Sequence, residues 1–168
     1  MNFSIDLQID IADSDSLPTI DEINGWCAEI FFYLKKSTQQ TDFIKEILAK
    51  DCEFSVIIVN REQIKELNSQ YRGKDKSTNV LSFPFDYHEL PEDIDLAYRL
   101  LGDIVICDSV VEEEAREQQK EYKAHWAHIF VHGVLHLCGF DHIDNDEAEI
   151  MESIETDIMK NCGFPAPY

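Results

Sequence analysis

The chain opens with a strict alternation of apolar and polar residues. The apolar positions are Phe3, Ile5, Leu7, Ile9 and Ile11. A period of two turns one side of a segment toward a core, so this stretch predicts a half-buried strand. A helical spacing follows, with Ile23, Cys27, Ile30 and Leu34 on one face. Thr19 and Glu22 form a capping box, and we expect this helix to run to about Lys36.

The rest of the chain continues this mixture of strands and helices. A polar connection at 37–42 leads to a short helical or extended stretch that ends at Leu48. Strands are predicted at 53–59, 79–85 and 102–107, and helices at 61–70 and 144–160. An acidic loop spans 86–99, and a long helical region begins at a cap on Asp108 or Ser109 and breaks near Lys120. No linker or repeat divides the chain, so we expect one α+β domain over residues 1–168, with a four-stranded mixed sheet and helices packed on it.

Composition indicates a globular protein of a reducing compartment. No apolar run is long enough to span a membrane and no basic, apolar leader opens the chain, so we expect a cytoplasmic protein. Five cysteines without a C-x-x-C pair predict reduced thiols rather than a disulfide framework. Cys138 is expected to be a small buried core residue, with a stray metal ligand as the alternative.

Three histidines lie close together near the end of the long helical region, in the stretch HGVLHLCGFDH. His132 and His136 are four residues apart and share one face of a helix. Gly139 suits a left-handed helix end, and the turn that it allows brings His142 back toward the other two. Three imidazoles leave one position open on a tetrahedral zinc ion, as in catalytic sites. Nickel or copper would also bind such a site, and the alternative is a buried helix with incidental histidines.

The residue after the first histidine limits the chemistry of this site. Metalloproteases of the H-E-x-x-H type carry their general base there, but this chain has Gly133. Zinc alone lowers the pKa of a water ligand to roughly 7, so hydrolysis does not depend on that base. The spacing therefore favours a metal hydrolase that is not a standard protease.

The histidine stretch resembles the signature of the YbeY-type endoribonucleases, which act in ribosomal RNA maturation. It departs from the family pattern at Phe140, where the family has tyrosine. A second block, NSQYRGKDKSTNVLSFP from Asn68 to Pro84, also matches, with Ser77 where the family usually has proline. The segments LGDIVI at 101–106, the acidic run at 144–157 and the closing GFP at 163–165 fit as well. The resemblance implies an α+β fold with a zincin-like metal site whose ligands are His132, His136 and His142.

The same resemblance assigns a catalytic arginine to Arg72. Its planar guanidinium can hold a phosphate and offset charge that builds up on the scissile group. Lys74 is a candidate for a second phosphate contact. His128, one turn before the first ligand, would approach the substrate or support the ligands, and Asp141 would either orient a ligand imidazole or cap the turn. We expect His88 and His125 to face solvent and Trp26 and Trp126 to lie in the core.

These residues favour metal-dependent cleavage of single-stranded RNA, with the ribose 2′-hydroxyl or a metal-activated water as nucleophile. The resemblance implies a role in maturation of the 16S rRNA 3′ end and in ribosome quality control, with RNA and a ribosomal protein or the small subunit as partners. Two alternatives remain open: a metal hydrolase of another substrate class, and a non-catalytic ribosome-assembly factor in which zinc is structural.

Net charge is an obstacle to this interpretation. The chain carries 14 basic and 34 acidic residues, a net charge of −20, which is unusual for a protein that binds nucleic acid. The stretch from Arg61 to Lys76 is the exception, with five bases against three acids. If it lies beside the metal it would form a small positive funnel, and otherwise it is a solvated surface. The acidic faces would suit a partner with a basic surface.

Overall fold

The computed structural model describes residues 1–12, 15–38, 40–91 and 93–168. It shows an α+β domain, as the hydrophobic pattern predicts. In chain order the elements are β1 (Phe3–Ile9), α1 (Ile20–Lys36), α2 (Asp42–Ala49), β2 (Asp51–Val59), α3 (Arg61–Arg72), β3 (Val80–Pro84), a short 3-10 turn (Tyr87–Glu89), β4 (Tyr98–Cys107), α4 (Asp108–Glu117), α5 (Tyr122–Leu137) and α6 (Asn145–Asn161).

The four strands form one mixed sheet in the order β1-β2-β4-β3. β1 and β4 run parallel to β2, and β3 is antiparallel to β4 with Leu81 opposite Val105. β3 therefore lies at one edge of the sheet. Gly102 pairs with Pro84 at a φ of 126°, and a Cβ at this position would lie 2.0 Å from the Phe83 carbonyl oxygen. Only glycine fits where the two strands approach so closely.

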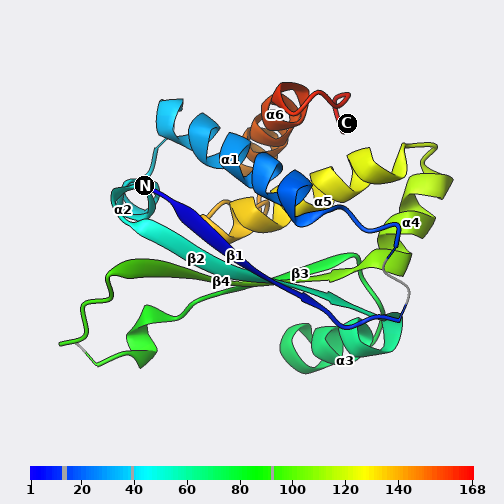
Figure 1. The fold of residues 1–168 in the computed structure, drawn as a ribbon, viewed down its shortest axis with the longest axis horizontal. Coiled ribbons are helices and arrows are strands. Elements are labelled where there is room, and N and C mark those ends of the chain that lie inside the picture. The colour runs from blue at the N-terminus through cyan, green and yellow to red at the C-terminus, as the bar shows by residue number, and fades with distance from the viewer. Residues whose placement is uncertain (13–14, 39, 92) are drawn as a thin grey trace.

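Helices cover the sheet on both faces. α1, α5 and α6 lie over one face and α3 lies against the other (Figure 1). The larger core, between the sheet and the first group, includes Trp26, Trp126 and Phe130. The smaller core joins Ile64 of α3 to Leu81, Val105 and neighbouring apolar residues. Both tryptophans lie in the larger core, as predicted.

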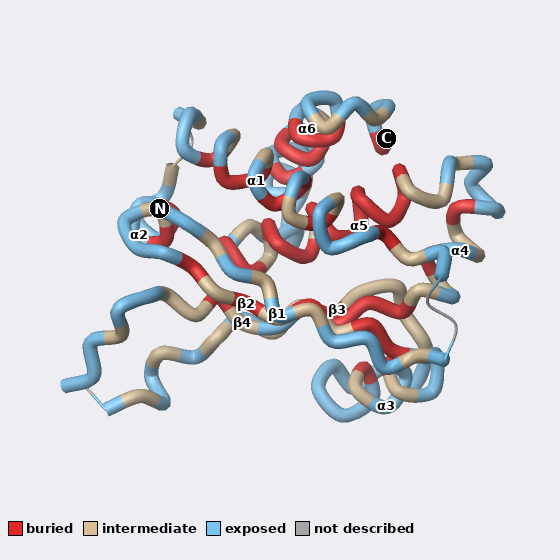
Figure 2. Tube along the Cα trace, in the orientation of Figure 1, coloured by how far each residue is buried: buried red, intermediate tan, exposed pale blue. Residues whose placement is uncertain are grey.

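α5 is the most deeply buried helix, and its place in the core positions the histidines. Buried residues follow one another along most of its length (Figure 2). A helix that is apolar on nearly all sides belongs in the middle of a fold. At Gly133 it approaches the sheet so closely that a Cβ would lie 3.0 Å from Ile104 Cγ2. Ser82 Oγ of β3 also donates a hydrogen bond to the Gly133 carbonyl oxygen at 3.1 Å.

The local signals in the sequence are confirmed at some element ends and wrong at others. Thr19 and Glu22 form the expected capping box, and Asp144 caps α6. The predicted cap of α4 is wrong, because Cys107 occupies the cap position without a side-chain bond. Asp108 instead accepts hydrogen bonds from two aromatic side chains packed behind α4, Tyr122 and Trp126.

Several boundaries also differ from the prediction, most of them by one or two residues. β1 ends at Ile9 rather than Ile11, and β4 begins at Tyr98, inside the predicted acidic loop. The stretch before Asp51, for which helix and extended chain were both open, is helix α2. In the parts of the chain that the structure describes, no helix combines the length and apolar character needed to cross a bilayer.

Candidate metal centre

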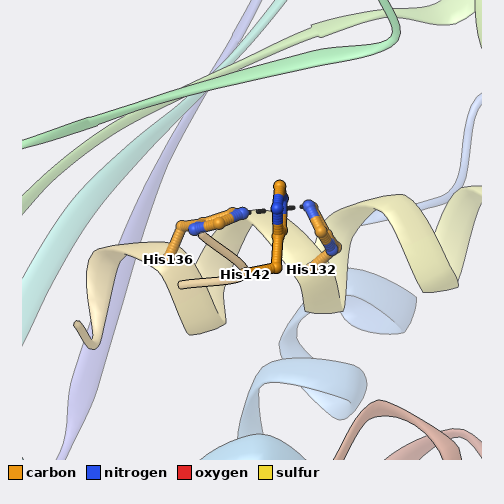
Figure 3. A group of neighbouring side chains, drawn as sticks. All are labelled: His132, His136 and His142. Carbon is orange, nitrogen blue, oxygen red and sulfur yellow. Dashed lines mark hydrogen bonds between the residues drawn. The ribbon is translucent and has the colours of Figure 1, made fainter. Parts of the chain in front are cut away.

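His132, His136 and His142 converge at the C-terminal end of α5. One ring nitrogen from each lies within 4.8 Å of the others, and no second group of three potential ligands occurs among the described residues. His132 and His136 come from consecutive turns of the helix, and His142 reaches the same point from the segment that follows it (Figure 3). The two helical imidazoles bring their Nε2 atoms to 3.0 Å of each other.

Hydrogen bonds on the far side of each helical imidazole set its tautomer. His132 Nδ1 lies 2.6 Å from Glu155 Oε1, and His136 Nδ1 lies 2.9 Å from the Phe140 carbonyl oxygen. Both partners are acceptors, so each Nδ1 carries the proton and each Nε2 of a neutral ring presents a lone pair. Two lone pairs at 3.0 Å repel each other unless a cation lies beside them. The donor set therefore fits a metal ion, for which imidazole nitrogen is a common ligand.

Burial lowers the pKa of His136, and the neighbouring His132 and His142 lower it further. The neutral, ligating form of this imidazole is therefore favoured over the imidazolium at neutral pH.

The turn after α5 is built to return the chain to this site. Gly139 has a φ of 90°, in the left-handed region predicted for it. Gly139 N–H donates to the His136 carbonyl and Phe140 N–H donates to the Leu135 carbonyl, each at 3.0 Å, which together form a Schellman motif. The motif places the Phe140 carbonyl where His136 Nδ1 donates to it. One glycine thus helps to hold the second histidine and to direct the third.

Glu155 of α6 is the residue that sequence reasoning missed. Its side chain is fully buried and accepts hydrogen bonds from His128 Nε2 at 2.7 Å, His132 Nδ1 at 2.6 Å and the Tyr168 hydroxyl at 2.5 Å. Burial raises the pKa of this carboxyl, but the bonds from His128, His132 and Tyr168 outweigh it and lower the pKa to about 2. The sequence contains one indication of this role: Glu155 is a carboxylate on the apolar face of α6, which it shares with Met151, Ile154 and Ile158.

The two other histidines of α5 are buried. The expectation that His125 faces solvent is wrong: it is 4% exposed and its Nε2 lies 3.2 Å from Glu114 Oε1. His128 Nε2 lies 2.7 Å from Glu155 Oε2, and His128 is not among the residues that line the groove described below. His88, by contrast, is exposed as expected.

A groove of about 690 Å³ opens in front of the histidines. Its wall includes β3 and the loop before it, and the basic side chains along it are Arg72, Lys74 and Lys76, against one acid, Asp141. Arg72 Nη2 donates to the Ser82 carbonyl of β3 at 2.8 Å, and its guanidinium lies 5.7 Å from the centre of the Phe83 ring. The arginine is held at the sheet edge with the rest of its donors available to a ligand in the groove.

The other members of the basic stretch point elsewhere. Arg61 pairs with Glu113 and Lys65 lies 3.9 Å from Asp75, and neither lines the groove. Asp141 accepts from the backbone N–H of His142 at 2.8 Å, which is the turn-capping alternative rather than a bond to a ligand imidazole. Asn79 lines the groove and donates to Glu114, which ties the loop before β3 to α4.

Comparisons with known proteins identify a similar structure and a family. The chain is similar to the solution structure of TM1509 from Thermotoga maritima, with 25% sequence identity and a TM-score of 0.56 over 95% of this chain and 89% of that one. The family profile described as Endoribonuclease YbeY matches residues 22–163, which contain all three histidines, Arg72 and Glu155. The chain belongs to the YbeY endoribonuclease family.

Proposed function

We propose that this protein is a single-strand-specific, metal-dependent endoribonuclease that acts in the cytoplasm on ribosomal RNA. The observation that carries the proposal is the common groove, in which three converging imidazoles face a wall with Arg72, Lys74 and Lys76. A cation site beside basic side chains is suited to a phosphodiester, because both neutralise charge on the phosphate. Membership of the family supports RNA as the polymer.

His132, His136 and His142 would hold the metal, and zinc is our first choice because three neutral imidazoles suit it. A bound divalent ion would supply Lewis-acid chemistry, polarising the scissile phosphate and lowering the pKa of water. The groove has a volume of about 690 Å³ and is lined in part by the edge strand β3, and we expect it to take one strand of RNA rather than a duplex.

Arg72 would position the substrate in this scheme. Its guanidinium is fixed at one nitrogen by the Ser82 carbonyl, which leaves its other N–H groups to bind two phosphate oxygens. As charge builds up on the phosphate during cleavage, the same donors stabilise it. Lys74 would add a phosphate contact, and Asp141 would hold the backbone that carries His142.

Peptide hydrolysis by the usual metalloprotease route is disfavoured by packing as well as by sequence. Gly133 stands where such enzymes have a glutamate, and the first atom of any side chain there would lie 3.0 Å from Ile104 Cγ2. A base at this position would have to displace Ile104, which is fully buried.

The test is cleavage of an end-labelled single-stranded RNA, with duplex RNA and single-stranded DNA of the same sequence as comparisons. We expect cleavage of the first alone, loss of metal and activity in His136→Ala, and loss of activity with metal retained in Arg72→Ala. Lys65→Ala is the matched control, since it removes a base from the same helix outside the groove. Equal cleavage by all variants would refute the proposal, and full function of Arg72→Ala in cells would favour the non-catalytic assembly factor.

The ribosomal role has its own test. We propose that the substrate is the 3′ end of 16S rRNA in small-subunit particles, where the acidic faces of the protein would meet a basic ribosomal protein. Purified precursor particles should be cut at this end by the wild type and not by Arg72→Ala. Cleavage of naked precursor at many sites, with none in particles, would count against this role.

A further inference from the structure

Glu155 lies at the centre of a hydrogen-bond cluster between α5, α6 and the C-terminal segment. A fully buried carboxylate is costly unless donors satisfy it. Here three donors converge on its two oxygens: His132 Nδ1 on Oε1, and His128 Nε2 and the Tyr168 hydroxyl on Oε2. Of the four side chains in this cluster, His132 is the one that lines the groove.

The division of the donors between the two oxygens determines what Glu155 does for His132. His128 and Tyr168 occupy Oε2, so Oε1 is available to His132. This bond keeps the proton of His132 on Nδ1 and leaves Nε2 as the ligating atom. An ionised acceptor also makes the imidazole a stronger donor to a metal than a neutral acceptor would. His136 has only a backbone carbonyl in the corresponding place.

Tyr168 brings a distant part of the chain to this cluster. Its ring stands nearly perpendicular to that of His128, with centroids 5.2 Å apart. The segment before it is fastened by Lys120, whose Nζ donates to the Pro167 carbonyl at 2.8 Å. The hydroxyl therefore reaches Glu155 from a segment that is itself held in place.

We propose that Glu155 is a positioning residue of the metal site and that Tyr168 supports it, so that α6 and the C-terminal segment set the affinity of a site whose ligands all lie elsewhere. The inference rests on the proposed metal centre. It assigns to Glu155 the orientation of His132, and to Tyr168 the orientation of Glu155, with no contact of either residue to the substrate.

The first experiment measures Zn²⁺ affinity by competition with a chromophoric chelator. Loss of a carboxylate that orients a ligand histidine weakens metal binding about 10- to 100-fold. We expect a loss in this range for Glu155→Gln and a smaller loss in the same direction for Tyr168→Phe, which removes only a hydroxyl and leaves the core intact. Glu152→Gln removes the same charge from the exposed face of α6, and Glu114→Gln removes the carboxylate that contacts His125. Both controls should bind Zn²⁺ as the wild type does.

A second readout needs no metal. Long-range ¹H–¹⁵N correlation spectra of the metal-free protein report the tautomer of each imidazole, and His132 should be protonated on Nδ1 in the wild type and in Glu152→Gln. In Glu155→Gln this resonance should shift or average with the other tautomer while that of His136 stays in place. Unchanged Zn²⁺ affinity and an unchanged His132 tautomer in a folded Glu155→Gln protein would overturn the inference and leave the metal centre standing. Failure of the wild type to bind Zn²⁺ would instead overturn the proposed metal centre.

Discussion

Replacing Gly133 with alanine tests how closely α5 packs against the sheet. The added Cβ would lie 3.0 Å from Ile104 Cγ2 and 3.4 Å from both Ile104 Cδ1 and Val80 Cγ2. Ile104 is fully buried and β-branched, so it has little freedom to move aside. Gly25 in α1 is the matched control, because a Cβ there meets nothing within 4 Å.

The two substitutions share one energy term and differ in the other. Alanine in place of a mid-helix glycine stabilises a protein by about 0.5–1 kcal/mol. Gly25→Ala should show this gain in full. At Gly133 the overlap with Ile104 adds an overpacking cost of about 1–3 kcal/mol, which leaves a net loss of about 0–2.5 kcal/mol. For a chain of this size each kcal/mol corresponds to about 2–4 °C in Tm.

Urea denaturation with a chelator present is the suitable assay, since bound metal would add stability by mass action. We expect Gly25→Ala to raise the free energy of unfolding and Gly133→Ala to lower it or leave it unchanged. In an Ile104→Ala background, where the overlapping methyl group is gone, Gly133→Ala should become stabilising. Equal stabilisation by both glycine substitutions in the wild-type background would refute this account of the packing.

Three further substitutions or treatments test the site and the core. Arg72→Lys should bind metal normally yet cut RNA about 10²- to 10³-fold more slowly, because an ammonium group cannot replace the planar set of donors of a guanidinium. Cleavage at the wild-type rate would show that the positive charge alone suffices. Gly139→Ala should lower the free energy of unfolding by about 1–2 kcal/mol and weaken Zn²⁺ binding, because a φ of 90° is costly for alanine. Calorimetry measures the first effect and metal competition the second. Unchanged values would contradict the role of the turn. Cys138 should resist alkylation by iodoacetamide at pH 8 in the folded protein, because burial raises the pKa of its thiol to about 12. Mass spectrometry measures the extent of alkylation, and rapid alkylation would be inconsistent with this burial.

The elements of this fold were predictable because most of them carry a strong local pattern. The alternation in β1 and the capping box at Thr19 each involve residues a few positions apart. The start of β4 at Tyr98 was missed because its pairing with Asp51 is set by a strand far away in the sequence. The cap of α4 was wrong for a related reason: Asp108 is used by aromatic residues of the next helix.

The same distinction separates the predictable from the unpredictable part of the site. The spacing of His132 and His136 is local, and the structure brings both to His142. His125 was predicted to face solvent, but its carboxylate partner, Glu114, lies on another helix. The sequence of the helix that carries His125 contains no indication of this contact. Glu155 is 23 residues from His132, and its only sign in the sequence is a carboxylate on an apolar helix face. Such a residue next to a metal motif should be examined as a support for the ligands.

Net charge and RNA binding are reconciled by where the bases lie. Of the basic stretch, Arg72, Lys74 and Lys76 line the groove, whereas Arg61 and Lys65 lie beside acids outside it. Three contacts to a single strand give a slope of log K against log salt concentration of about −2, at roughly −0.7 per contact. Repulsion from the acidic remainder weakens with added salt as well, so the slope should be no steeper than this. Anisotropy of a labelled single strand, titrated with the chelated protein so that nothing is cut, measures it. A slope of about −4 would mean that RNA follows a basic surface beyond the groove.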